Sequence, residues 1–255
     1  MPRVLRIVST TMPHRVREQG AGTVTVEIKV MSSPPMRSVI HAVGPQFEKG
    51  SGFKLAVKIA SVVELRRRID AGEDFDVAIL TSELIDALIK GGKIAAKDRV
   101  NIARSGLGVA VRAGGRKVDV SSTEAFRQAL LDAKSVMYAS GSAATAHIDN
   151  VFEKLGVVEQ VKSKVILQPA GGHIGSAIAE GAAELGLTHI PVILESSGAE
   201  LAGPLPAELR FHVDFSSGTG AASMEPEGAR ALIRYLMAPE VTAVIKAKGL
   251  ERLSH

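Results

Sequence analysis

The sequence predicts an α/β protein of two lobes, with mostly parallel sheets and a ligand cleft between the lobes. Short apolar runs alternate with segments whose apolar residues recur every three or four positions, which is the repeated β-α pattern of a parallel sheet. The runs are almost wholly apolar, as expected of strands buried on both faces. Two β-like segments, 106–115 and 211–218, bracket a central block that has its own strands and helices. This arrangement is typical of one lobe inserted into another.

The two β-like segments set the expected boundaries. We expect residues 25–107 together with 214–255 to form the first lobe, and residues 108–213 to form the second, inserted lobe. Residues 1–24 are rich in arginine and lack the apolar stretch of about 7–15 residues that a secretory signal needs, so a poorly ordered extension is expected there. Because ligands of open α/β sheets bind beyond the carboxyl ends of the strands, the site is expected in the cleft.

The first lobe is expected to repeat one unit three times. Each unit is a short apolar strand followed by a helix with one apolar face, and glycines at 72 and 91–92 close the second and third helices. The strands are expected at 26–31, 54–60 and 77–80.

The second lobe repeats the same pattern. Strands are expected at 135–139, 164–168 and 185–190. A helix ending at Gly156 should follow the first of them, and a short helix should follow the second. From about Glu225 the chain returns to a helical pattern, which should pack against the first lobe.

The composition excludes several classes of function. The chain of 255 residues has no cysteine, which excludes disulfides, thiolate metal sites and cysteine nucleophiles. Aromatic residues make up 4% and tryptophan is absent, which argues against a nucleic-acid binder that stacks bases on rings. The net charge of +4 is mild, and no apolar run approaches the roughly 20 residues of a membrane helix. Metal-binding, P-loop and nucleophile-elbow motifs are missing, so we expect no metal and no cofactor.

The starts of the predicted helices carry the candidate site residues. Serine caps helices and proline suits the first turn, so Ser32 and Ser33 before two prolines permit either helix capping or contact with a ligand. Helix N-termini carry partial positive charge and attract anions. Small or hydroxylic residues recur at the later junctions, so a site for an oxyanion or carboxylates is expected. The other candidates at these junctions are Arg37, Ser61, Ser140, Ser142, Ala144, Thr145, Gly171 and Gly172.

Two histidines could add acid–base chemistry. His173 begins a helix after two glycines, and His189 lies near the end of a buried strand. A structural hydrogen bond is the ordinary role of such a residue. A pair beside an anion site is also suited to moving a proton near neutral pH.

Several stretches resemble the type II periplasmic binding proteins, specifically the molybdate-binding-protein-like branch of ABC transporter solute receptors. The resemblance covers about residues 25 to 252 and is carried by VMSSPPMRSVIHAVGPQFEKGSG, RRRIDAGEDFDVAIL, FEKLGVVEQV, GAAELGLTHI and AGPLPAELR. It implies a two-lobed fold that binds an oxyanion through serine hydroxyls, backbone N–H groups and a tyrosine hydroxyl. It also implies that Ser61 and Ala144 match ligand-binding positions. At the first serine position this chain has Pro35, just after Ser32 and Ser33, and at the tyrosine position it has His189.

The resemblance implies a solute-binding protein that clamps a small anion, either an organic polycarboxylate or a molybdate-like oxyanion, for an ABC permease. The same branch resembles aconitate isomerases, which move a proton on a tricarboxylate, so an isomerase with His189 and His173 as proton carriers is the alternative. A cytoplasmic sensor is a third hypothesis, because no signal peptide is visible. The resemblance itself implies a periplasmic location. We expect a monomer that binds neither nucleic acid nor membrane.

Overall fold

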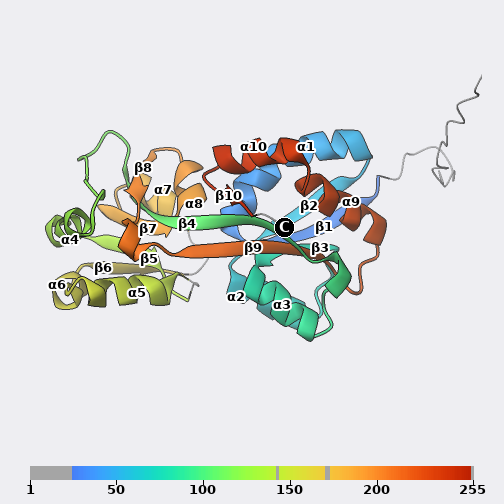
Figure 1. Cartoon of the computed structure of the whole chain (residues 1–255), viewed down its shortest axis with the longest axis horizontal. Coiled ribbons are helices and arrows are strands. Elements are labelled where there is room, and N and C mark those ends of the chain that lie inside the picture. Colours follow the sequence, from blue (N-terminus) through green and yellow to red (C-terminus); the bar gives the residue numbers. More distant parts are fainter. Residues whose placement is uncertain (1–24, 142–143, 170–172, 254–255) are drawn as a thin grey trace, which may run out of the picture.

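The structure is a computed structural model that describes residues 25–141, 144–169 and 173–253. It has two α/β lobes, joined by two long strands that run side by side from one lobe to the other (Figure 1). The fold class is therefore as predicted. Within the described ranges, no helix is long and apolar enough to cross a membrane.

The first lobe contains the three β-α units that the sequence predicts. Its parallel strands lie in the order β2-β1-β3, with α1, α9 and α10 on one side and α2 and α3 on the other (Figure 1). The helices are α1 (Arg37–Ser51), α2 (Val62–Asp70), α3 (Ser82–Lys90), α9 (Pro226–Leu236) and α10 (Pro239–Ala247), with the 3-10 turns η1 (Pro34–Met36) and η2 (Ala96–Asp98). The strands are β1 (Glu27–Ser32), β2 (Lys54–Ile59) and β3 (Val77–Thr81).

The second lobe is built from an unbroken stretch of chain between the two long strands. Its parallel strands lie in the order β7-β5-β6, and β8 pairs with a long strand nearby. The strands are β5 (Val136–Ala139), β6 (Val165–Gln168), β7 (Leu185–His189) and β8 (Ala199–Pro204). The helices are α4 (Thr123–Asp132), α5 (Thr145–Lys154), α6 (Val158–Lys162), α7 (Ile174–Ala179) and α8 (Ile190–Leu194), with the 3-10 turn η3 (Ala207–Leu209).

The two long strands are β4 (Val100–Arg112) and β9 (His212–Thr219), close to the two predicted connectors. Strand β4 pairs with β9 and the short β10 (Glu251–Arg252) in the first lobe, then with β7 and β8 in the second. Hydrogen bonding is therefore continuous through β4, and the two sheets form one network of ten strands. The predicted lobe boundaries at 107/108 and 213/214 fall within these strands and stay predictions.

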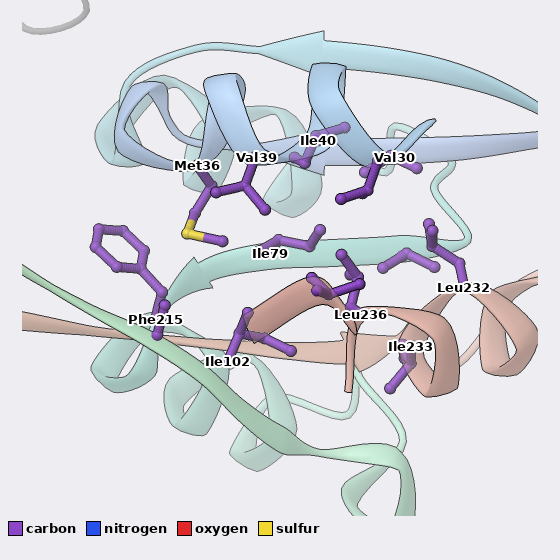
Figure 2. Close-up of a cluster of buried hydrophobic side chains, with 14 of the residues drawn as sticks. Val30, Met36, Val39, Ile40, Ile79, Ile102, Phe215, Leu232, Ile233 and Leu236 are labelled. Atoms are coloured by element: carbon purple, nitrogen blue, oxygen red, sulfur yellow. The ribbon is translucent and has the colours of Figure 1, made fainter. Parts of the chain in front are cut away.

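Each lobe has its own apolar core. In the first lobe, side chains from β1, β3, α1 and α9 meet between the sheet and the helices, and Met36 and Phe215 close one end of this core (Figure 2). The second lobe has a comparable cluster around Phe126 and Leu130 on α4. Phe211 packs against both clusters, just before β9. The strand ends are therefore fixed on two separate, well-packed bodies.

Two features differ from the predicted pattern. All pairings that involve β4 or β9 are antiparallel, because these strands cross between lobes and are not part of the β-α repeat. Strands β2 and β6 were predicted to be buried on both faces, yet they are the outer strands of the network, and Leu167 on β6 is 55% exposed. Among the strands that the structure describes, the inner strand β3 is the one buried at all of its positions.

Candidate functional site

A cavity of about 90 Å³ lies between the lobes, at the ends of the parallel strands. We call it the interlobe cavity. Its polar side chains come from Ser33, Ser61 and Thr81 in the first lobe and from Thr188 and His189 in the second. The described lining includes no Asp, Glu, Lys or Arg. The remaining described lining residues are Pro34, Pro35, Val62, Ala139, Gly141, Ala144, Ile148, Ile174, Leu187, Val192, Val213 and Phe215.

Ser33 is the most informative residue of the cavity. It is 1% exposed, and it precedes η1 without making a side-chain capping bond. Its Oγ is buried and has no hydrogen-bond partner among the described residues. An unpartnered buried hydroxyl costs about 1–3 kcal/mol, so such a group calls for an explanation. A ligand in the adjoining cavity would supply the missing partner.

Helix starts surround the cavity. The residues before α2, α3, α5 and α8 are Ser61, Thr81, Ala144 and His189, and all four line it. The side chains of Ser61 and Thr81 already accept hydrogen bonds from the backbone N–H groups of Glu64 and Leu84. The residues before α5 and α8, Ala144 and His189, make no side-chain capping bond. The lining is therefore rich in neutral donors beside partially positive helix ends.

The side chain of His189 is positioned by a hydrogen bond to Ser105 on β4, the strand that both lobes share. Its Nδ1 lies 3.0 Å from Oγ of Ser105, and its ring meets Phe215 edge-on, with centroids 6.2 Å apart. Within the described residues, no hydrogen bond to Nε2 is found. Burial lowers the pKa of His189 from its ordinary value near 6.5 to about 4, so the ring is neutral at pH 7.

Three predicted site serines and threonines are absent from the lining of the cavity, and their hydroxyls bond to backbone carbonyls. Ser32 does not line it, because its Oγ donates to the carbonyl of Ile79 at 3.1 Å. Ser140 and Thr145 likewise donate to backbone carbonyls, those of Gln168 and Ala139. Their role as ligand donors stays a prediction. Ser142, Gly171 and Gly172 lie outside the described residues.

Arg37 and His173 lie in a neighbouring groove that shares Pro34 and Val192 with the interlobe cavity. Arg37 Nη1 is paired with Oε1 of Glu195 at 2.8 Å, an ion pair between the lobes. Arg37 was predicted to bind the ligand, but the structure directs its guanidinium to a protein carboxylate. His173 does not line the interlobe cavity, so the two predicted histidines occupy different hollows.

Three polar residues near the site were missed in the sequence. Thr81 is the last residue of the buried strand β3, and Ser33 directly follows β1, so the same rule would have found Thr81. Thr188 lies within the mostly apolar run 185–190, so it has no separate signal in the sequence. Ser105 gives no local signal, because only the pairing of β4 with β7 brings it to His189. Within the described chain, no cluster of three or more potential metal ligands exists.

Comparisons with known proteins agree with this geometry. The family of bacterial extracellular solute-binding proteins matches residues 28–251. An aconitate isomerase from a Pseudomonas species is 29% identical over 230 residues, which cover 88% of this chain and 87% of the relative. The molybdate-binding protein ModA of Azotobacter vinelandii is 26% identical over 238 residues, which cover 90% of each chain. The solved periplasmic molybdate-binding protein of Azotobacter vinelandii superposes with a TM-score of 0.73 at 18% identity, covering 89% of this chain and 100% of that one.

Proposed function

Because this chain belongs to the bacterial extracellular solute-binding protein family, we propose that it clamps a small anion between its lobes and delivers it to an ABC permease. The observation that carries this proposal is Ser33, whose buried Oγ is unpartnered at the wall of the interlobe cavity. Two ligand classes remain open, a molybdate-like oxyanion and an organic polycarboxylate. Family membership also supports a location outside the cytoplasm.

The donor set suits a fully ionised anion. The described wall of the cavity carries hydroxyls and helix N-termini but no fixed charge. Hydrogen bonds from neutral donors to a charged group are worth about 1.5–3 kcal/mol each. Several such bonds in a low-dielectric pocket can hold an anion without a counter-charge, because helix N-termini supply the positive potential. A cation would find no carboxylate among the described lining residues.

A thermal-shift series tests the proposal. The series contains molybdate, tungstate, sulfate, citrate, cis-aconitate and trans-aconitate. A ligand that binds only the native state stabilises it by mass action and so raises the melting temperature. At a free ligand concentration of a hundred times Kd, the free energy of unfolding increases by about 2.7 kcal/mol. We expect one class of anion to raise it and the Ser33→Ala variant to lose most of that shift. A shift of equal size in both proteins would place the anion elsewhere and remove the support for this site.

An isomerase on the same scaffold is the second candidate, favoured by the neutral ring of His189 and by the 29% identical aconitate isomerase. Isomerisation requires a group that accepts a proton from carbon and a group that returns it. His189 Nε2 is the described side-chain nitrogen in the cavity that is suited to this role. Incubation with cis- or trans-aconitate in D₂O, followed by NMR, would reveal exchange of carbon-bound hydrogen. Turnover with deuterium uptake would establish that the protein is an isomerase and would contradict the proposal that it is only a receptor.

A further inference from the structure

The groove beside the interlobe cavity is a second concentration of polar chemistry. We call it the rim groove. It has a volume of about 780 Å³ and is formed where the start of α1 meets the chain before α7, the end of α8 and the end of α10. The titratable side chains along its described wall are Arg37, His41, His173, Glu195 and Lys248. Four of the five can carry positive charge, and one can carry negative charge.

The charges of the rim groove are not balanced by the protein. Among the described residues, Arg37 has one ion-pair partner, Glu195, and no ion pair is found for Lys248. Arg37, His41 and His173 all lie close enough to Glu195 to favour its ionised form electrostatically. Burial nevertheless raises the pKa of Glu195 above its usual range, because the carboxyl is only 19% exposed. The single carboxylate therefore leaves positive charge in excess.

A buried hydroxyl points to the same groove independently. Ser38, in the first turn of α1, lines it and is 8% exposed. Its Oγ has no hydrogen-bond partner among the described residues. The arrangement repeats the combination found at Ser33, an unpartnered serine hydroxyl beside a hollow. Here the hollow is lined by basic side chains, whereas the described wall of the interlobe cavity is neutral.

We propose that the rim groove is a second anion-binding site, distinct from the interlobe cavity, that takes a phosphate or carboxylate group between the two lobes. Lys248, His41 and His173 would face the anion, and Ser38 would donate its hydroxyl. Because these residues come from both lobes, an anion bound there would hold the lobes together. The site could be filled by free phosphate or by a carboxylate of a larger acid, so both are tested.

Titration calorimetry with inorganic phosphate, and separately with citrate, tests the second site. Lys248→Gln should weaken binding at the rim groove two- to fivefold, the effect expected of losing one partly exposed charge contact. Lys246→Gln is the matched control, since Lys246 lies two residues before Lys248 in the last turn of α10, is exposed and does not line the groove. Glu195→Gln should strengthen binding by a similar factor, because it removes the carboxylate that competes for the basic groups. A response to phosphate alone would identify phosphate as the ligand, and a response to citrate would show that carboxylates are accepted.

The variants also separate this proposal from the proposed function. Ser33→Ala should leave binding at the rim groove unchanged while it weakens binding in the interlobe cavity. If Lys248→Gln and Lys246→Gln behave alike, or if Glu195→Gln weakens binding, the second site is overturned. If Ser33→Ala abolishes all anion binding, the rim groove is likewise overturned, while the interlobe site survives.

Discussion

His189 and Ser105 connect the second lobe to the strand that both lobes share, with Nδ1 and Oγ 3.0 Å apart. Ser105 Oγ also lies 3.2 Å from the carbonyl oxygen of Gly106, to which it donates. A hydroxyl has one proton, so the oxygen is left to accept from Nδ1–H of His189. The lone pair is then on Nε2. This tautomer makes His189 an acceptor in the cavity, which suits a base or a ligand that carries its own proton.

The two adjacent serines are expected to respond in opposite ways to replacement by alanine. Ser33→Ala removes an unpartnered buried hydroxyl, so the ligand-free protein should keep or slightly gain stability. Ser32→Ala removes the bond to the Ile79 carbonyl and should cost about 1 kcal/mol of stability. Anion affinity should fall about tenfold or more in Ser33→Ala, since bonds to charged groups are worth about 1.5–3 kcal/mol. Chemical denaturation and calorimetry measure the two effects. Equal affinities in the two variants would contradict this assignment.

Replacing His189 separates the receptor from the isomerase. In a receptor, His189→Gln should keep appreciable anion affinity, because binding needs no proton carrier and the amide still presents a polar group to the cavity. In an isomerase, the same change removes a proton carrier and should reduce turnover by about 10²–10⁴. Calorimetry and NMR of aconitate in D₂O give the two readouts on one variant. Ser61→Ala serves as a control that alters the same wall without removing a proton carrier.

The neutral ring of His189 predicts a loss of stability in acid. Its pKa is about 4 in the native protein and near 6.5 when unfolded, so the unfolded chain binds more protons between these values. The full stability is present above about pH 6.5 and should fall by up to about 3 kcal/mol as the pH drops to 4. The His189→Gln variant lacks this contribution, so the stability difference between the two proteins should change over this window. Urea denaturation at pH 7, 5.5 and 4 measures it. If the stability difference between the wild type and His189→Gln did not change with pH, the pKa of His189 would be the same in the native and unfolded states.

Two glycine replacements, one in a strand and one in a helix, are expected to change stability in opposite directions. A Cβ at Gly186 on β7 would lie 2.7 Å from Cγ1 of Ile178, so Gly186→Ala should cost about 1–3 kcal/mol. A Cβ at Gly50, inside α1, would meet nothing within 4 Å. Gly50→Ala should therefore raise stability by up to about 1 kcal/mol, since alanine favours the helix. Thermal denaturation compares the two variants. A stable Gly186→Ala protein would mean that α7 can move away from the sheet.

The spacing of apolar residues in the sequence predicted most of the helices and strands of the fold. The apolar runs at 26–31, 54–60 and 77–80 became β1, β2 and β3, and glycines at 72 and 91–92 follow the ends of α2 and α3. Helix α4 and strand β8 were not predicted, although Ser122 caps α4 by accepting from the N–H of Ala125. Ser122 is therefore a local signal in the sequence for the start of α4.

The site was harder to predict than the fold. Ser32 and Ser33 are neighbours with similar local signals, but strand alternation sends one hydroxyl to the Ile79 carbonyl and leaves the other at the cavity. The pairing of Arg37 with Glu195 joins residues from the two lobes and depends on how the lobes meet. Such contacts have no periodic signature, because they arise only after both lobes are folded.

The route of the chain through β9 has a consequence for the order of folding. Strand β9 completes the first lobe by inserting between β3 and β4, where Phe215 pairs with Thr81. The parallel strands of the second lobe, by contrast, come from one continuous stretch. Contacts between distant residues form slowly, because a long loop must first be closed. We therefore expect the second lobe to acquire protection from hydrogen exchange before the first. During synthesis, the first lobe should remain incomplete until its C-terminal strand and helices emerge.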